Sequence, residues 1–150
     1  MKINRMSKKI IFNIITPERV VFEREIFQAT LPVVHGIITI LPNHRSYIGA
    51  LKAGEIILKD GNEEILLATS GGFVEFHKNK LIVLADTAEV AEEIDLKRAE
   101  EARKRAEDLK NEKISMGEME YARVAAMIEK EMTRVRVARK HHTRHGIKVD

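Results

Sequence analysis

The sequence predicts an N-terminal antiparallel β-sandwich, or flattened barrel, followed by a C-terminal antiparallel α-helical hairpin. The composition changes near residue 88, because all three prolines and six of the eight glycines precede that position. Short runs rich in β-branched residues dominate before it, and Ala, Glu, Lys and Arg dominate after it. Such a shift marks a domain boundary. We therefore divide the chain into a β domain (1–88), a two-helix unit (89–140) and a basic tail (141–150).

Seven short segments of the β domain are predicted to be strands, because turn residues separate them at intervals of about 8–12 positions. They are KIIFNII, QATLPVV, GIITILP, GEIILKD, EEILLATS, GFVEFHK and LIVLAD. Asp60-Gly61 predicts a type I′ hairpin turn, whose two central residues need positive φ. Lys78-Asn79 predicts a second, weaker one. The last segment is apolar on both faces, which places its strand inside the sheet.

Two amphipathic helices are predicted, one from Asp95 to about Asn111 and one from Glu118 to about Lys140, with Ser115 and Gly117 in the break. A short link predicts antiparallel packing. Alanine side chains are small, and burial contributes only about 25 cal/mol per Å², so we expect the hairpin to fold but to open readily. The first apolar stripe consists of Leu96, Ala99, Ala102, Ala106 and Leu109, and the second of Met119, Ala122, Ala126, Met132 and Val135, with Ile128 beside it.

The motifs of several enzyme classes are missing from the sequence. There is no P-loop, dinucleotide-binding glycine motif, zinc-protease motif or nucleophile elbow. The absence of Cys excludes disulfides and cysteine chemistry and is consistent with a reducing compartment. His141, His142 and His145 lack acidic neighbours, which favours a basic tail over a metal site. We expect a non-catalytic chain that requires no metal or cofactor.

Charge and hydropathy restrict the partners. The net charge of +3 is mild, so the whole chain is not an obvious nucleic-acid binder. The apolar run after the N-terminal lysines is about six residues long, too short for a membrane span. An alternative is a β-sandwich binding module whose basic C-terminal tail takes up nucleic acid or an acidic protein, with an affinity that falls steeply as salt rises.

Three passages carry recognisable motifs: GIITILPNHRSYIGALKAGEI, LLATSGGFVEFHKNKLIVLAD, and the helical pair IDLKRAEEARKRAE and EYARVAAMIEKEMTRVRVA. In sequence and in order, these passages resemble the epsilon subunit of F-type ATP synthases. The resemblance implies a sandwich of about ten strands and a rotor subunit of the central stalk, which couples proton translocation to ATP synthesis. It also implies a peripheral location on the cytoplasmic side of the bacterial plasma membrane.

The same resemblance implies partners for each part of the chain. The sandwich is expected to contact the gamma subunit and the membrane c-ring. The hairpin is expected to lie folded on the sandwich or to extend toward the alpha/beta catalytic head and restrain ATP hydrolysis. Basic residues near the C-terminus are expected to meet acidic surfaces of that head. They are Arg134, Arg136, Arg139, Lys140, Arg144 and Lys148.

An I-D-x-x-R-A motif, formed by Ile94, Asp95, Arg98 and Ala99, helps some bacterial members of that family to bind ATP. The resemblance thus implies ATP as a regulatory ligand. The implied site consists of Glu89, Ile94, Asp95, Arg98, Ala99, Arg105, Lys130 and Arg134. Lys130 replaces an arginine of ATP-binding members, and lysine lacks arginine's planar fork.

The charge pattern at this helix start has two interpretations. Lys97 and Arg98 lie where the helix dipole disfavours cations by roughly 0.3–1 kcal/mol each, and a bound phosphate there would be attracted by both. The structural alternative is that Asp95 caps the helix and that Glu101 neutralises Arg98.

An apolar turn, VVHGI, is expected by resemblance to face the c-ring. It contains Val34, His35, Gly36 and Ile37, and some relatives carry an acidic residue near this position. His44 matches a family histidine near the gamma contact. The alternatives are a core turn for VVHGI and a turn-stabilising role for His44.

Overall fold

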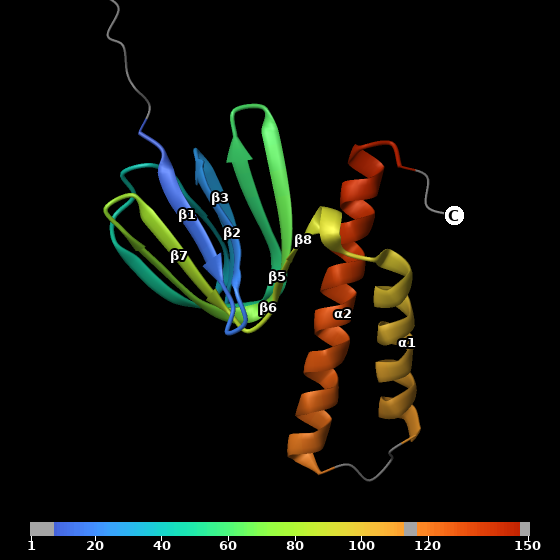
Figure 1. Cartoon of the computed structure of the whole chain (residues 1–150). Helices are drawn as coiled ribbons and strands as arrows, with labels where there is room; N and C mark the ends of the chain where they lie inside the picture. Colours follow the sequence, from blue (N-terminus) through green and yellow to red (C-terminus); the bar gives the residue numbers. More distant parts are fainter. Residues whose placement is uncertain (1–7, 113–116, 148–150) are drawn as a thin grey trace, which may run out of the picture.

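The computed structural model describes residues 8–112 and 117–147, and in Figure 1 the strands form one lobe with the two long helices beside it. The β elements are β1 (Ile10–Ile15), β2 (Val20–Ile26), β3 (Gln28–Val33), β4 (Gly36–Ile40), β5 (Tyr47–Asp60), β6 (Glu63–His77), β7 (Lys80–Ala85) and β8 (Ala88–Val90). They are followed by a 3₁₀ turn, η1 (Ala91–Glu93), and by α1 (Leu96–Glu112) and α2 (Glu118–Arg144). The sandwich and the helical hairpin are both confirmed.

Two long strands account for the difference between the expected ten strands and the eight in the described residues. β5 has 14 residues and β6 has 15, and each curves at the base of the sandwich in Figure 1 so that it serves both layers. The bend in β6 falls at Gly71 and Gly72, whose φ angles are 123° and 143°. A Cβ on Gly72 would lie 2.0 Å from the Leu84 carbonyl oxygen, so glycine alone fits. EEILLATS and GFVEFHK are therefore one bent strand.

The strand order is β2-β1-β7-β6-β5-β3-β4, with β8 paired to β6. The prediction of a wholly antiparallel sheet is wrong in one ladder, because β1 pairs with β7 in parallel, from Ile11 opposite Lys80 to Ile15 opposite Leu84. β7 lies between β1 and β6, as its apolar faces predicted. β2, whose sequence VVFEREI mixes charges with apolar residues, lies at the edge and was not predicted.

The sequence predicted a clear type I′ turn at Asp60-Gly61 and a weaker one at Lys78-Asn79, and the two observed hairpin turns reverse that order. The β5–β6 turn consists of Gly61 and Asn62, and of these only Gly61 has a positive φ, at 63°. That geometry fits a type II′ turn one residue after the predicted type I′ turn. Lys78 and Asn79 have φ angles of 48° and 61°, as a type I′ turn requires.

The apolar residues form two separate clusters. The larger one fills the sandwich and includes Phe12, Leu31, Ile56 and Phe76. The smaller one, which we call the helix–sheet cluster, joins the helices to β6 and η1. It consists of Leu66, Ala68, Ala91, Ile94, Leu96, Ala99, Val135, Val137 and Ala138.

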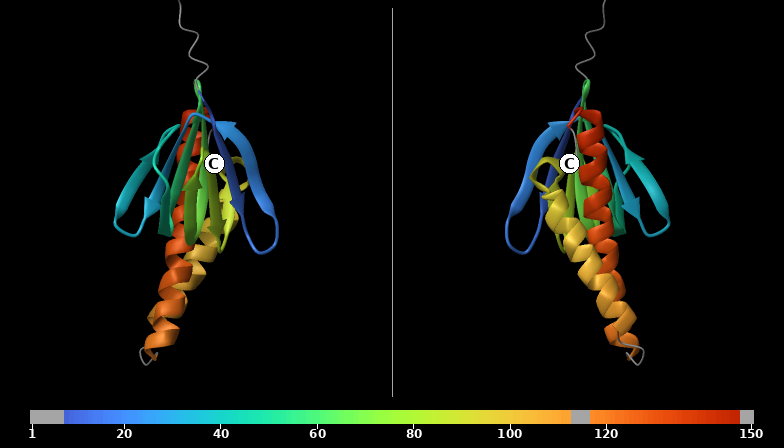
Figure 2. Two further views of the ribbon diagram at one scale, coloured as in Figure 1. Left: turned by 90° about the vertical axis from the view of Figure 1, so that its left-hand side faces the viewer. Right: turned by 90° about the vertical axis from the view of Figure 1, so that its right-hand side faces the viewer.

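α2 packs along the sheet against β6 and β5, and in Figure 1 most of α1 lies farther from the sandwich than α2. From α2 the helix–sheet cluster includes Val135, Val137 and Ala138, and the opposite end of the hairpin extends past the sandwich (Figure 2). Val124 and Ala106 are the buried residues of that projecting part. The hairpin is therefore attached to the sheet at one end.

Several helix predictions need correction. Leu109, Met119 and Met132, all assigned to apolar stripes, are exposed, and Val124, Val137 and Ala138 are buried instead. α2 continues to Arg144, so the first four residues of the predicted basic tail are helical, and residues 148–150 lie outside the described part. The expected boundary after residue 88 falls inside β8. Of the described helices, neither has a stretch long and apolar enough to span a membrane.

Candidate functional site

The first turn of α1 is built around a side-chain cap. The Arg98 amide donates to Asp95 Oδ1 at 3.1 Å, and the Ala99 amide donates to the Asp95 carbonyl at 3.0 Å. The predicted N-cap is thus confirmed. Ile94 and Ala99 are buried in the helix–sheet cluster, so they fix the position of this turn. No acidic residue occupies the first turn, and the Arg98 side chain is exposed.

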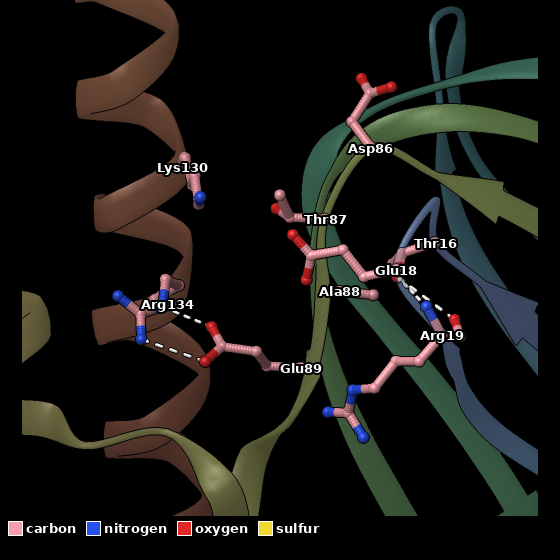
Figure 3. A pocket seen from close by; sticks show the side chains of 9 residues that line it. All are labelled: Thr16, Glu18, Arg19, Asp86, Thr87, Ala88, Glu89, Lys130 and Arg134. Atoms are coloured by element: carbon pink, nitrogen blue, oxygen red, sulfur yellow. Dashed lines mark hydrogen bonds and ion pairs between the residues drawn. The ribbon is translucent and has the colours of Figure 1, made fainter.

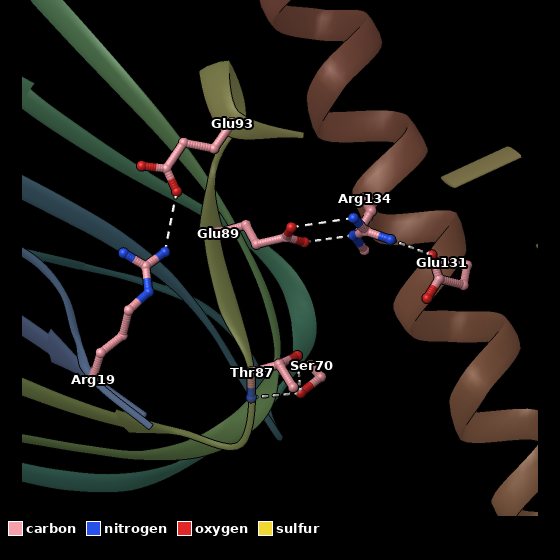
Figure 4. Close-up of polar contacts among 7 residues, drawn as sticks. All are labelled: Arg19, Ser70, Thr87, Glu89, Glu93, Glu131 and Arg134. Carbon is pink, nitrogen blue, oxygen red and sulfur yellow. Dashed lines mark hydrogen bonds and ion pairs between the residues drawn. The ribbon is translucent and has the colours of Figure 1, made fainter. Parts of the chain in front are cut away.

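Arg134 on α2 forms a bidentate ion pair with Glu89 on β8 (Figure 4). Its Nε and Nη2 donate to the Glu89 carboxylate at 2.5 and 3.1 Å, and its Nη1 donates to Glu131 at 2.8 Å. Burial alone would lower the pKa of Arg134, but the bonds to Glu89 and Glu131 outweigh it and raise the pKa above its ordinary value. The guanidinium is therefore charged, and each of its three nitrogens donates to a carboxylate.

Two cavities lie on either side of this ion pair. The first, of about 380 Å³, is lined by Glu89, Glu93, Asp95, Arg98, Glu101, Ala102, Arg105 and Arg134. The second, of about 390 Å³ and shown in Figure 3, is lined by Thr16, Glu18, Arg19, Asp86, Thr87, Ala88, Glu89, Lys130 and Arg134. Both volumes lie in the range typical of small-ligand sites. Glu89 and Arg134 line both cavities and so form the wall between them.

The structure brings five of the eight predicted ATP-site residues to one cavity: Glu89, Asp95, Arg98, Arg105 and Arg134. Lys130 lines only the second cavity. Ile94 and Ala99 lie beneath the site in the helix–sheet cluster.

The first cavity contains more acid than the sequence indicated. Glu93 was not predicted; it pairs with Arg19 of the sandwich at 3.2 Å (Figure 4). No local pattern signals this contact, because 74 positions separate the two residues. Four carboxylates and three guanidinium groups therefore line the cavity. The structural alternative, in which Asp95 caps α1 and Glu101 neutralises Arg98, is supported only in its first part. Asp95 caps the helix, but within the described part of the chain no carboxylate pairs with the Arg98 side chain.

The basic end of α2 is tied to other elements by ion pairs. Lys140 Nζ lies 2.5 Å from Glu55 Oε1 on β5, and Arg144 pairs with Glu64 on β6. Arg139 Nη2 lies 2.5 Å from Glu100 Oε1 on α1. These cations therefore neutralise carboxylates of the same chain, which argues against the alternative of a free basic tail for nucleic acid.

The predicted contact residues fall in two places. Val34 and Ile37 flank the β3–β4 turn and are 56% and 74% exposed, with His35 exposed and Gly36 at φ 140° between them. This excludes the alternative of a core turn. His44 lies elsewhere: its ring meets the edge of Phe76 at 5.9 Å, and its Nδ1 lies 2.7 Å from the Arg45 carbonyl oxygen.

An exposed apolar area on the sandwich was missed by the sequence reasoning. Ile48, Phe73 and Leu84 come from neighbouring strands β5, β6 and β7 and are all exposed, and together with Ile82 they line a shallow cavity. We call these four residues the apolar outer face. The sequence did contain a signal for this area, because these apolar residues alternate with buried apolar residues along their strands. A strand that is apolar on both faces needs a packing partner on each face. Such contiguous apolar surface marks an interaction site.

Comparisons with known proteins agree along most of the chain. Residues 9–91 match the family model described as the ATP synthase delta/epsilon chain β-sandwich domain, and residues 92–139 match that of its long α-helix domain. An ATP synthase epsilon chain from Dehalococcoides mccartyi is 44% identical over 132 residues, which is 88% of this chain and 94% of the relative. One from Desulforamulus reducens is 39% identical over 133 residues, covering 89% and 99% of the two chains.

Solved structures support the fold. A chain in the Euglena gracilis mitochondrial ATP synthase structure (OSCP/F1/c-ring) superposes with a TM-score of 0.70 and 18% identity, over 83% of this chain and 78% of that one. A chain in the Tetrahymena thermophila mitochondrial ATP synthase structure (central stalk/c-ring) gives 0.57 and 15%, over 90% and 97%. Both family models, the epsilon-chain relatives and the shared fold lead to one conclusion: this chain belongs to the delta/epsilon-chain family of ATP synthases.

Proposed function

We propose that the chain is the epsilon-type rotor subunit of an F-type ATP synthase, non-catalytic by itself, whose hairpin restrains ATP hydrolysis when it leaves the sandwich. The observation that carries this proposal is the attachment of α2. A small helix–sheet cluster and ion pairs from Arg134, Lys140 and Arg144 hold it to the sheet. Few buried apolar contacts give a low local opening free energy. Opening frees the same cations for acidic surfaces of the catalytic head.

The sandwich offers two surfaces for the other stalk partners. Val34 and Ile37 at the β3–β4 turn suit the c-ring, and the apolar outer face suits the gamma subunit. The solved neighbours come from assemblies that contain a c-ring, in line with this assignment. We place the subunit peripherally on the cytoplasmic side of a bacterial plasma membrane, as expected for a chain similar to bacterial epsilon chains.

A pull-down of the full chain with gamma tests the second surface. Phe73→Glu should abolish capture because it buries an unpaired charge in the interface. Lys59→Glu, an exposed change near the other end of β5 from Ile48, should not. Equal capture by both variants would exclude this face as the gamma contact.

ATP is proposed as a regulatory ligand of the first cavity. Arg98 and Arg105 on α1 and Arg134 on α2 line it together, so a triphosphate there would join the two helices. Binding would favour the folded hairpin in proportion to the difference in affinity between the two states. At a concentration one hundred times the Kd, the gain is about 2.7 kcal/mol.

Calorimetric titration of the full chain with ATP, with and without Mg²⁺, tests this ligand. We expect saturable binding that Arg98→Ala abolishes. Arg136→Ala is the matched control, because Arg136 is an exposed arginine of α2 that lines neither cavity. If no heat of binding is detected at millimolar ATP, the I-D-x-x-R-A motif serves only to start α1.

A further inference from the structure

We infer that the Glu89 carboxylate is a gate that keeps Arg134 from the nucleotide, an inference that rests on the proposed ATP site. The Nε and Nη2 atoms of Arg134 present two parallel donors, the same edge with which arginine grips a phosphate. Glu89 occupies both donors, at 2.5 and 3.1 Å. A phosphate can therefore reach this edge only after Glu89 has left it.

The position of Lys130 supports the same conclusion. Lys130 lines the second cavity only, and Arg98 and Arg105 line the first only. In Figure 3 its side chain lies on the Thr87 side of the Glu89–Arg134 pair, and within the drawn residues it has no partner. With the gate closed, one ligand cannot face Lys130 and the α1 arginines together. Opening the pair removes the wall and joins the two cavities.

The charges of the first cavity show why Glu89 is the controlling acid. Asp95 caps α1, and Glu93 is held by Arg19 of the sandwich. Glu101 pairs with none of the described residues. Among the described residues, Glu89 is the one acid of this cavity that pairs with the guanidinium of an arginine proposed to bind phosphate. Its removal frees a planar fork and also lowers the local negative charge, so both effects favour an anion.

The Glu89–Arg134 gate also links the affinity for ATP to the packing of α2 on the sandwich. Glu89 belongs to β8 and Arg134 to α2, so the closed pair ties the helix to the sandwich. ATP must exchange this contact for its own contacts with both helices. Its apparent affinity is then reduced by the fraction of molecules in which the pair is open.

Calorimetry of the full chain with ATP distinguishes a gate from a ligand. Glu89→Gln should bind ATP more tightly by about tenfold, because an opposing charge within hydrogen-bond distance of the phosphate site is removed. Glu93→Gln is the matched control: it removes one carboxylate from the same cavity without freeing Arg134, and should change the Kd by about twofold or less. Glu89→Asp, whose shorter side chain cannot span the fork, should give an intermediate Kd.

Each result has a distinct meaning. Arg134→Ala added to Glu89→Gln should cancel the gain, because the two residues act as one unit. Weaker or unchanged ATP binding by Glu89→Gln, with helical circular dichroism retained, would overturn the gate but leave the ATP site intact. Binding by neither the unmodified chain nor Glu89→Gln at millimolar ATP would overturn the proposed ATP site, and the gate with it.

Discussion

Replacement of Val137 by alanine tests whether the helix–sheet cluster holds the hairpin. Val137 is 0% exposed and packs among Leu66, Ile94 and Ala138. The change removes two buried methyl groups, worth about 0.8 kcal/mol each. The residual cavity raises the cost to about 2–3 kcal/mol. The equilibrium constant for packing of α2 on the sheet should then fall by about 30- to 150-fold, since 1.4 kcal/mol is a factor of ten.

Amide hydrogen exchange of the full chain measures this loss. Protection in the last three turns of α2 should fall by that factor, and protection in β1 and β7 should remain, because their core is a separate cluster. In the assembled enzyme the same change should deepen the inhibition of ATP hydrolysis. Met127→Ala, on an exposed part of α2, is the control and should alter exchange little.

Two results would refute this reasoning. Unchanged exchange in α2 would mean that the ion pairs alone seat the helix. Equal loss of protection in β1, β7 and α2 would mean that sandwich and hairpin open as one unit.

Two further predictions concern pH and backbone geometry. Burial, followed by the neighbouring His145, lowers the pKa of His141 below its ordinary 6.5, with His142 adding to the shift and Glu92 opposing it. Folding thus disfavours protonated His141, so the packing of α2 on the sheet should weaken as pH falls below 6.5. The hydrogen-exchange protection factors of α2, which correct for the pH dependence of the intrinsic exchange rate, should fall with pH, and His141→Gln should reduce that fall. Protection factors that do not change with pH would contradict this. Gly72→Ala should cost more than about 3 kcal/mol in urea unfolding, because its Cβ would overlap the Leu84 carbonyl, whereas Gly61→Ala, with open space around it, should cost less.

Local signals predicted the elements better than the pairing. The apolar faces of LIVLAD located β7 inside the sheet, and the Asp95 cap located the start of α1. The parallel pairing of β1 with β7 was not predictable, because turn chemistry reports only on neighbouring antiparallel strands. The exposed Met119 shows the limit of helical periodicity: spacing finds an apolar stripe, but not how far along the helix a partner extends.

The candidate site shows the same limit. The resemblance named Asp95, Arg98 and Arg105 at the start of α1 and along it, and Arg134 on α2, and the fold brings all four to one cavity. The bond from Arg134 to Glu89 spans 45 positions, and only the packed structure reveals that it separates Lys130 from the α1 arginines. Residue types fix what a site can bind, and packing decides which side chains are already engaged.

The one-ended attachment of the hairpin gives it the mechanics of a lever. α2 has 27 residues, so at about 1.5 Å per residue it is about 40 Å long. Its fulcrum is the stretch around Val135 and Val137, and the free arm from there to Glu118 measures about 25 Å. A tilt of about 10° at the fulcrum moves the far end by about 4 Å. A force on the projecting end therefore acts through a long lever arm on a small patch of valine and alanine. Mechanical force, as well as ligand binding, can thus control whether the hairpin stays packed on the sheet.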